Sequence, residues 1–600
     1  MFKSLCCSYS SVHHREVTIV NSENEKQLKK GMTRRDFVKG SAVAAVGLAA
    51  GGLLTGCASS EEKEPSKKKT TSTKPAETST EKKWSWETKP EPIASSEIKK
   101  TIDTDVLVIG NGLAGTVAAL SAFEAGAKVI LIDKNDTFAA RGGHITAFNS
   151  KLQKEMGIKV DYRQVVRRWI EWAQGRCKEE LLWLFAHKSG ASMDWVMNMV
   201  EPRGVKFAMW DGYYKGPDYT EVPVTHFAYK DGTNFMYQNG VIEGAGNPVL
   251  VEELTNVAKE KGIEIHYKTP AVQLVRDGSG PVTGVIAGDK GNYTQYKASK
   301  GVIIAAGDYA SDKEMVERFS PFTLNVDSQI YLPNKCNTGD AHKMALWAGG
   351  AMQKVEPHGA TIHLESGAQS YAFLHVNAEG NRFKNEDVNT QSKSCTKEYQ
   401  TDGIAFTIYD ADGLKQVQQQ IDNGLGGGLF WGQTFMRMGT KFDLKAEEEV
   451  LAMHVENGKV LKADTIEELA EKMGVPADNL AATVKRYNEL YEMKNDVDYG
   501  KRSELLTPIV KAPFYAGKLL STCLTMSGGL RTNTQCQVLD EDDKPVEGLY
   551  VAGSAGGDFF ANDYPTICPG INHGRCITFG RIAGLIAAGK SADEIPSLEV

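Results

Sequence analysis

The sequence predicts an α/β fold built around a Rossmann-like nucleotide-binding unit, and three neighbouring patterns carry that prediction. Asp105–Ile109 is a short apolar run rich in β-branched residues, and a G-x-G-x-x-G stretch followed by helix-forming residues starts at Gly110. The run Lys128–Ile132 then ends at Asp133, 21 residues after Gly112. Strand, glycine turn, helix, strand and acid in this order are typical of a dinucleotide site, in which an acid ~20 residues on binds a ribose hydroxyl.

Each glycine of this turn has its own expected role. Gly110 permits the tight turn, Gly112 lets the backbone approach a pyrophosphate, and Gly115 lets the helix pack closely on the strand. The N-terminus of that helix can offer free N–H groups to phosphate. We therefore assign to the nucleotide site Gly110, Gly112, Leu113, Ala114, Gly115, Asp133 and Lys134.

Length and composition limit the classes of protein to consider. The chain has 600 residues, too many for one compact core, so we expect two domains and non-globular ends. A formal net charge of −7 argues against a nucleic-acid-binding surface. The ten cysteines lack the spacing of zinc or iron–sulfur ligands, so no metal site is predicted, while disulfide pairing is left open.

The start of the chain has the pattern of an export signal. A paired-arginine segment begins at Met32, and the apolar run Gly40–Gly56 leads from it to Cys57, as in a twin-arginine signal with a lipoprotein box over residues 32–57. Five glycines in the apolar run disfavour the alternative, a buried helix. Residues 1–31 are then an upstream extension. The pattern predicts twin-arginine export and a lipid-anchored protein on the extracytoplasmic face of the membrane, with Cys57 lipidated.

A tether is expected next. Residues 58–100 are rich in Ser, Thr, Lys, Glu and Pro, without a packing period. This composition predicts a disordered linker. Trp84 and Trp86 are expected to pin its end to the folded body.

Three later stretches have the form of further nucleotide-binding segments. Arg141-Gly142-Gly143 is a second glycine turn, placed to wrap the far side of a pyrophosphate whose charge Arg141 would neutralise. The extended stretch Ile263–Val275 adds Ala271 and Val272, and an apolar strand from Gly301 stops at Ala306 and Gly307. Such strand ends are expected at the carboxyl edge of the sheet, where a nucleotide binds.

Taken together, the motifs resemble those of FAD-dependent flavoproteins of the fumarate reductase and succinate dehydrogenase family. The resemblance runs from about Thr101 to Ala588. It rests on nine segments in the family's order: GNGLAG, the Asp133 strand end, RGGHITAF, GVIIAAGDY, NTGDAHKMALWAGGAM, NAEGNRFKNE, MSGGLRTN, VEGLYVAGS and ITFGRIAG.

The resemblance implies an FAD-binding domain in two sequence pieces, residues 101–357 and 525–600, with an inserted α+β capping domain at 358–524. It also implies that FAD is the dinucleotide. Carried over by position, Asp340 approaches the cofactor, and Gly553 and Ser554 lie near its ribityl chain, with Ser in place of the usual acid. Negative charge on the reduced flavin would face the start of the last helix at Gly570, Ile571 and Asn572.

Departures from the family pattern concern the substrate. The T-E-x-x-R-G-x-G stretch of fumarate reductases is absent between His358 and Asn377. The positions of their proton-donating arginine, substrate histidine and carboxylate-binding arginine correspond here to about Thr390, Thr525 and Ile567. A dicarboxylate needs paired cationic partners, so fumarate and succinate are disfavoured as substrates.

The catalytic candidates come from the same comparison. The segment around Tyr564-Pro565 is similar to the 3-ketosteroid dehydrogenase branch, although two extra residues precede the following glycine. We assign Tyr564 as acid or oxyanion donor, Thr525 and His358 as polar substrate contacts, and Arg531 as a cationic support. Structural roles remain alternatives: a core tyrosine, a buried histidine and an arginine that anchors a strand.

The resulting hypothesis is an extracytoplasmic FAD-dependent reductase, in anaerobic electron transport, that saturates an activated C=C bond of an enone or α,β-unsaturated carboxylate. The sequence has neither a second nucleotide fingerprint nor a C-x-x-C-H haem motif, so the expected electron donor is external, a membrane or haem cytochrome. Two alternatives stay open. One is a ketosteroid-type dehydrogenase working in the oxidative direction, and the other is a ligand-binding lipoprotein that retains flavin.

Overall fold

A computed structural model of the protein describes residues 84–210, 222–231, 237–238, 241–242, 245–329, 333, 335–366, 371–425 and 442–598. All of them belong to one compact unit, Lys82–Val600. The predictions for the upstream extension, the export signal, Cys57 and most of the linker lie outside the described residues. Among the helices within these ranges, none combines the length and apolarity that crossing a bilayer requires.

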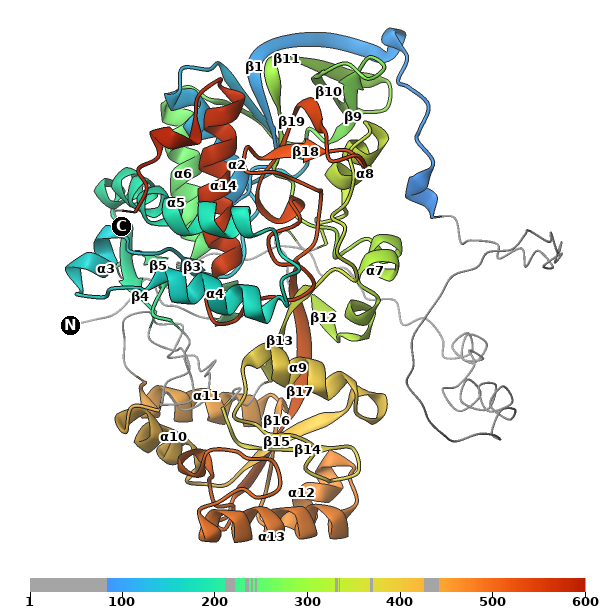
Figure 1. The fold of residues 1–600 in the computed structure, drawn as a ribbon. Helices are drawn as coiled ribbons and strands as arrows, with labels where there is room; N and C mark the ends of the chain where they lie inside the picture. Colours follow the sequence, from blue (N-terminus) through green and yellow to red (C-terminus); the bar gives the residue numbers. More distant parts are fainter. Residues whose placement is uncertain are drawn as a thin grey trace, which may run out of the picture. The chain divides into compact units, whose positions relative to one another are not determined.

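The principal sheet has eight strands, which come from both the N-terminal and the C-terminal parts of the described chain (Figure 1). Its central strand β1 (Ile98–Ile109) pairs in parallel with β2 (Val129–Ile132) and with β11 (Asn292–Ile304), and β11 pairs in parallel with β19 (Pro545–Val551). The remaining strands are β8 (Glu264–His266), β9 (Ala271–Arg276), β10 (Val282–Asp289) and β18 (Gln537–Leu539). Since β19 lies hundreds of residues after β11, the predicted Rossmann-like domain in two sequence pieces is confirmed.

Helices cover one face of this sheet: α2 (Leu113–Glu124), α5 (Glu179–Val200), α6 (Asn247–Glu260) and α14 (Ile571–Ala587). The first and last of them touch through small residues. A Cβ on Gly580 would lie 2.7 Å from the Ala114 carbonyl oxygen, and one on Gly584 would lie 2.4 Å from that of Ala118. Only glycine permits this spacing, which packs the middle of α14 against the start of α2.

Shorter elements complete the part of the chain that is predicted to bind FAD. They are β3 (His144–Thr146), α3 (Lys151–Glu155), α4 (Tyr162–Trp172), β4 (Lys206–Met209), β5 (Thr225–Tyr229), β6 (Tyr237–Gln238), β7 (Val241–Ile242), α7 (Lys313–Phe319), β12 (Ser328–Gln329) and α8 (Asp340–Trp347). Strands β3, β5 and β4 form a small separate sheet, which places the second glycine turn at its edge.

The inserted α+β part is built on a six-stranded sheet in which β17 (Phe514–Met526) is the common partner of four strands. Besides β17 and the short strand β12, which pairs with it, the elements are β13 (Ala360–Ser366), β14 (Leu374–Asn377), α9 (Thr390–Glu398), β15 (Ala405–Tyr409), α10 (Gly413–Asp422), α11 (Leu444–Glu456), β16 (Val460–Ala463), α12 (Ile466–Met473) and α13 (Ala477–Met493). Strands β13 and β17 run antiparallel and carry the chain into and out of the cap. The predicted boundaries at 357 and 524 therefore fall at two paired crossover strands.

The predicted linker is too long at its C-terminal end. Trp86 stacks on Phe319 with ring centroids 5.5 Å apart, and the indole N–H of Trp347 donates to the Trp86 carbonyl oxygen at 2.8 Å. Strand β1 already begins at Ile98. Residues 84–100 are therefore part of the folded body, as the apolar surface of Trp86 requires, and the linker prediction for them was wrong.

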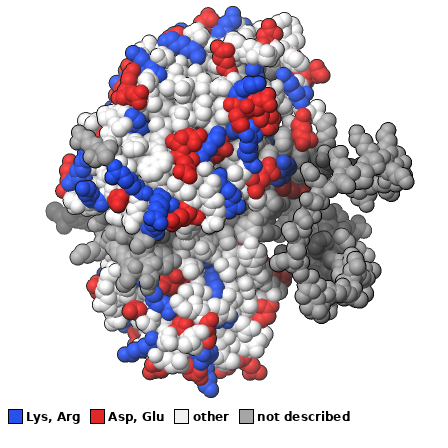
Figure 2. Space-filling view, in the orientation of Figure 1, with Lys and Arg blue, Asp and Glu red and all other residues white. Residues whose placement is uncertain are grey.

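The surface and the cysteines add two observations. On the face that Figure 2 shows, lysine and arginine are interspersed with aspartate and glutamate, without one dominant basic patch. The seven cysteines of the described residues are all free thiols. Within the same residues, no group of three or more His, Cys, Asp or Glu side chains is arranged to hold a metal ion.

Candidate active site

The glycine turn between β1 and α2 is a backbone cradle. Gly110 has φ of +104°, and a Cβ there would lie 2.5 Å from the Ala305 carbonyl oxygen. A Cβ on Gly115 would lie 1.8 Å from the Gly110 carbonyl oxygen, whereas one on Gly112 would meet only the Ala139 oxygen at 3.5 Å. Two of the glycines thus allow close packing, and the backbone of Gly112 is left open; that a pyrophosphate approaches it remains a prediction.

A cavity lies at the carboxyl ends of β1, β2 and β11, next to this cradle. Of the predicted cofactor residues, its lining includes Gly110, Gly112, Asp133, Lys134, Ala271, Ala306, Gly307 and Asp340. Sequence reasoning missed the others: Ile109, Ile132, Asn135, Ala139, Thr269, Ala305, Cys336, Thr338, Ala341 and Met344. Several of these follow strand ends directly, so adjacency to the predicted strands was the usable signal.

The carboxylate of Asp133 holds the cradle in shape as well as facing the cavity. It accepts hydrogen bonds from the backbone N–H groups of Asn111 at 2.6 Å and Asn135 at 2.8 Å. Burial raises the pKa of Asp133, although these hydrogen bonds offset part of the effect. The neighbouring Lys134 bonds Asp340 and Thr338, each at 2.7 Å, and so links the end of β2 to the start of α8.

The second glycine turn meets the N-terminus of α14. A Cβ on Gly142 would lie 3.1 Å from the His573 ring, and a Cβ on Gly570 would lie 2.4 Å from the His144 backbone. Gly143 is equally confined, because a Cβ there would lie 2.3 Å from the ring of Phe227. The predicted residues Gly142, Gly143, Gly570 and Ile571 are therefore brought to one place, beside the positive end of a long helix.

Asp308 is a buried hub that sequence reasoning missed. One of its carboxylate oxygens accepts hydrogen bonds from the Thr525 hydroxyl at 2.8 Å, the Met526 N–H at 3.1 Å and Arg141 at 3.3 Å. The other oxygen accepts from Asn337 at 2.6 Å. Arg141 also donates to the Leu524 carbonyl oxygen. The carboxylate directly follows Gly307, so its place after a strand-ending glycine was the available signal.

A polar group surrounds the start of α14. The Asn572 side-chain amide N–H donates to the Ser554 hydroxyl at 3.0 Å, and the Asn572 side-chain oxygen Oδ1 accepts from the Arg575 Nε–H at 2.8 Å. Val272 is half-buried on β9, and Gly553, on the turn η7 (Gly553–Ala555), packs against Ala114. Arg575 is 2% exposed, and no described carboxylate forms an ion pair with it. Burial lowers the pKa of Arg575 to about 10, so it remains a cation at neutral pH.

Tyr564 lies against this same helix end. Its hydroxyl oxygen accepts a hydrogen bond from the Asn572 backbone N–H at 3.2 Å, and its ring packs on Phe560 with centroids 5.1 Å apart. Burial raises the pKa of Tyr564 above its usual value. The phenol therefore stays protonated and keeps its O–H available as a donor. Its role in catalysis remains a prediction.

The structure gives the other catalytic candidates different surroundings. His358 is buried, stacks on Phe319 at 4.8 Å and contacts the Tyr309 hydroxyl at 2.6 Å; burial lowers its pKa to about 3, so the imidazole is neutral. Arg531 donates to the Asp540 and Glu541 carbonyl oxygens at 2.9 and 3.1 Å. This placement favours the strand-anchoring role for Arg531 over a cationic support at the substrate.

Three histidines near the second glycine turn were also missed. They are His144 on β3, His363 on β13 and His573 on α14, and the His573 Nδ1–H donates to the His144 carbonyl oxygen at 2.8 Å. Burial lowers the pKa of His144 to about 3, and the neighbouring His363 and His573 lower it further. Neutral imidazoles are hydrogen-bonding groups rather than anion-binding cations.

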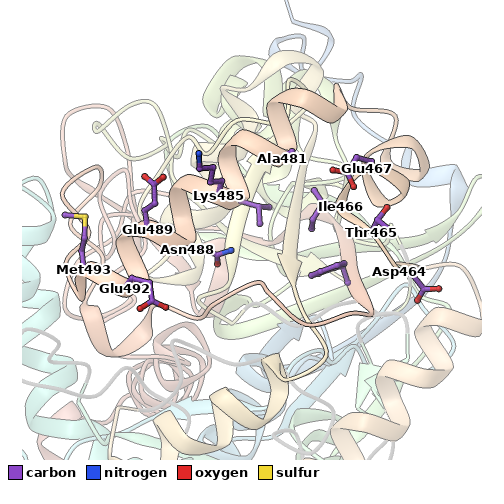
Figure 3. Close-up of a pocket in the computed structure, with 12 residues that line it drawn as sticks. Asp464, Thr465, Ile466, Glu467, Ala481, Lys485, Asn488, Glu489, Glu492 and Met493 are labelled. Atoms are coloured by element: carbon purple, nitrogen blue, oxygen red, sulfur yellow. The ribbon is translucent and has the colours of Figure 1, made fainter.

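A separate hollow lies on the cap, between α12, α13 and the start of β17 (Figure 3). Its lining includes Ile466, Glu467, Lys485, Glu489 and Phe514. It shares no residue with the lining of the cradle cavity. We therefore do not include it in the active site.

Comparison with known proteins agrees with this geometry. The sequence profile described as "FAD binding domain" matches residues 105–562, most of the chain. The protein belongs to this family of FAD-dependent flavoproteins, the fumarate reductase type, and is an oxidoreductase.

Curated relatives extend over most of the chain. A vinyl phenol reductase of Lactiplantibacillus plantarum is 28% identical, over 81% of this chain and 96% of the relative. A urocanate reductase of Eggerthella lenta is 27% identical, over 84% and 77%. A 3-oxosteroid 1-dehydrogenase of Mycolicibacterium smegmatis is 26% identical, over 81% and 98%. By name, two of these relatives are reductases and one is a dehydrogenase.

Among solved structures, the open conformation of a flavocytochrome c3 fumarate reductase is similar in fold. The TM-score is 0.61 at 24% sequence identity, covering 85% of this chain and 82% of that one. This likeness supports the fold class.

The residues present fit FAD. Gly110 and Gly115 sit where a Cβ would collide with backbone, and the open backbone of Gly112 adjoins a cavity lined by a strand-end carboxylate. Those features suit the adenosine and pyrophosphate half. The start of α14, with Asn572 and the buried cation Arg575, suits the redox ring, which becomes more negative on reduction.

Proposed function

We propose that this protein is an extracytoplasmic FAD-dependent reductase, serving anaerobic electron transport, that saturates an activated C=C bond of an enone or an α,β-unsaturated carboxylate. When bound, FAD supplies the hydride. The protein's own residues must then hold the substrate, stabilise the negative charge that develops on its carbonyl oxygen, and provide a proton.

The observation that carries this proposal is the group at the N-terminus of α14. The Tyr564 hydroxyl, the Asn572 backbone N–H and the Arg575 guanidinium converge there, and the last two supply partial and full positive charge. The three groups lie in a buried environment, where electrostatic interactions are stronger than in water. A protonated phenol held at this position can donate to a developing enolate or to its α-carbon.

Charge near the site favours a neutral or singly charged substrate. The hydroxyl of Thr525, which stands at the expected substrate-histidine position, donates to the buried carboxylate of Asp308. The guanidinium of Arg141 is bound to Asp308 and to the Leu524 carbonyl oxygen. Because Arg141 is already bound to Asp308, it is not available to pair with a second substrate carboxylate, which supports the proposed exclusion of fumarate and succinate.

Location and electron supply follow from the N-terminal pattern and the relatives. The twin-arginine pattern with Cys57 supports export and a lipid anchor on the outer face of the membrane. One relative is named a cytochrome fumarate reductase. A membrane cytochrome or small haem protein is the proposed electron donor, since an anchored enzyme stays close to the bilayer.

The direct test is stopped-flow absorbance of anaerobically reduced holoprotein mixed with enones, aryl acrylates, urocanate and fumarate. Rapid reoxidation of the flavin by one of the first three classes, and not by fumarate, is the expected result. Fumarate as the best oxidant would refute the proposed substrate charge. No reoxidation by any compound, with normal flavin content, would refute the reductase and favour a flavin-retaining binding protein.

The oxidative direction is the second candidate, and the placement of Tyr564 favours it. A phenol beside a helix N-terminus can polarise a ketone as well as protonate an enolate. Reduction of an artificial acceptor on adding saturated steroid ketones would support a dehydrogenase. Activity only with a reduced flavin and an unsaturated substrate would support the reductase.

A further inference from the structure

The segment that carries Tyr564, residues 557–570 between η7 and α14, is held in an unfavourable backbone conformation at two places. Asp558 has φ of +66° and Ala561 has φ of +57°. Left-handed backbone is costly for residues other than glycine, and alanine has no polar side chain that could compensate locally. Such a conformation persists only where surrounding contacts hold it.

The first holding contact comes from the FAD-binding part of the chain. Gln353 is 2% exposed, and its side-chain oxygen accepts a hydrogen bond from the Asp558 N–H at 2.9 Å. Its side-chain N–H donates to the Ala561 carbonyl oxygen at 3.2 Å. Both left-handed residues are thus bonded to one buried amide.

The second holding contact comes from the cap. Gln391, the second residue of α9, donates from its side-chain amide to the Asp563 carboxylate at 2.8 Å and to the Ala360 carbonyl oxygen at 2.9 Å. Its side-chain oxygen accepts from the Ile362 N–H at 3.1 Å. One buried side chain therefore joins the cap helix, the crossover strand β13 and the segment before Tyr564.

Asp563 transmits this contact to Tyr564. The oxygen that binds Gln391 also accepts the Tyr564 backbone N–H at 2.8 Å. Gly359, which directly precedes the crossover strand β13, packs closely on the backbone at Asn562 and Asp563. A Cβ on Gly359 would lie 2.7 Å from the Asn562 carbonyl and 2.8 Å from the Asp563 nitrogen. A continuous line of contacts runs from α9 through Asp563 and Tyr564 to the start of α14.

We propose that Gln391 is a positioning residue: its hydrogen bond to Asp563 holds the strained segment and sets the Tyr564 hydroxyl at the N-terminus of α14 when the cap is seated. The Tyr564 hydroxyl is then placed only when the cap packs against the FAD-binding part of the chain. An enzyme whose cap does not pack there lacks an aligned hydroxyl donor. The inference rests on the proposed function only for the chemical use of that hydroxyl.

Gln391→Glu in the FAD-loaded full chain tests the contact. It keeps an acceptor for the Ile362 N–H but places a carboxylate against Asp563 and the Ala360 carbonyl oxygen. The other titratable groups that face Asp563 are Arg176 and Cys395. At neutral pH we expect about tenfold faster hydrogen exchange at the Tyr564 and Asn572 amides and about tenfold lower kcat, the scale of one buried unpaired polar contact.

Acidification should reverse part of this effect, because two adjacent carboxyl groups can share a proton. The matched control is Gln419→Glu, the same change on the exposed face of the cap helix α10, which should alter neither quantity. Equal exchange rates in Gln391→Glu and the control would overturn the proposal.

Ala561→Gly supplies an independent test of the strain. Glycine adopts φ of +57° without steric penalty, so the segment should need the cap less. In this background we expect Gln391→Glu to change exchange by no more than about threefold; an undiminished effect would contradict the role of strain.

The two proposals fail differently. If Gln391→Glu accelerates exchange but Tyr564→Phe leaves turnover unchanged, positioning stands and the chemical role of Tyr564 fails. If Tyr564→Phe lowers turnover but Gln391→Glu changes nothing, the positioning proposal is overturned.

Discussion

The nucleotide cradle and the face beneath the cap are assembled in different ways. In the cradle, Gly115 packs against the backbone of Gly110, and Gly110 packs against the backbone of Ala305 at the end of the neighbouring strand β11. Beneath the cap, Thr525 meets Asp308 across 217 residues and Gln391 meets Asp563 across 172. The first region depends on the absence of side chains, and the second depends on particular side chains meeting. Substitutions should therefore affect cofactor retention in one region and turnover in the other.

In the cradle, the largest expected effect is loss of FAD from Gly115→Ala. The added Cβ would lie 1.8 Å from the Gly110 carbonyl oxygen, so the turn or the helix must move. Overpacking of this kind costs roughly 1–3 kcal/mol or more, which lowers FAD affinity at least ~10- to 100-fold. Flavin absorbance per protein after gel filtration measures it.

Gly126→Ala, at the other end of the same helix, is the control, since nothing lies within 4 Å of a Cβ there. It should cost some stability through its φ of +89° but leave FAD affinity unchanged. Full flavin content in Gly115→Ala would show that the cradle tolerates side chains, and the comparison would fail.

Tyr564→Phe should affect the other region alone. Removing the hydroxyl that accepts the Asn572 N–H should lower turnover by about 10²–10⁴, the usual contribution of a general acid, with flavin content unchanged. Single-turnover reoxidation of the reduced holoprotein separates this step from binding. A loss below about tenfold would remove Tyr564 from the chemistry.

Arg531→Met tests a candidate whose surroundings are structural. The guanidinium binds the turn at Asp540 and Glu541, so its loss should lower the free energy of unfolding by about 1–3 kcal/mol through unpaired carbonyl groups. The kcat of the folded holoenzyme should stay within about twofold of the parent. Urea unfolding and steady-state assays on one preparation give both values, and a selective fall in kcat would restore the cationic-support role.

The smallest effect is expected from Asp340→Asn at the rim of the cradle. Burial would raise the pKa of Asp340, but hydrogen bonds and charge from Lys134, with Thr338, outweigh it and lower the pKa. The pair therefore stabilises the protein above the unfolded carboxyl pKa of about 3.9, and its contribution is lost as pH falls through the lower folded value.

Because both side chains of this pair are partly exposed, the loss at neutral pH should be only about 0.2–1 kcal/mol, and it should vanish in acid. Urea midpoints of the apoprotein against pH measure it, with Asp542→Asn as an exposed control. A penalty that persists in acid would mean that Asp340 acts by packing rather than by charge.

Much of the nucleotide-binding region was predictable from the sequence. Strand periodicity, the glycine spacing and the acid at the end of β2 are local signals, and eight of the assigned residues line the cavity. The packing of Trp86 on the folded body was expected, but its partner Phe319 lies more than two hundred residues later, so no local pattern showed that residues 84–100 belong to that body. Asp308 and the three histidines were missed because no local pattern shows which buried polar groups will meet.

The sequence alone determined the fold class, the cofactor-binding turn and the order of its segments, because glycine sterics and strand periodicity act over a few residues. Tertiary structure alone decided the polar partners: Arg141 with Asp308, Arg531 with a surface turn, and Tyr564 with the start of α14. Those pairings require distant parts of the chain to come within about 3 Å. Such distances are set by the principal sheet together with the crossover strands β13 and β17, which connect it to the cap.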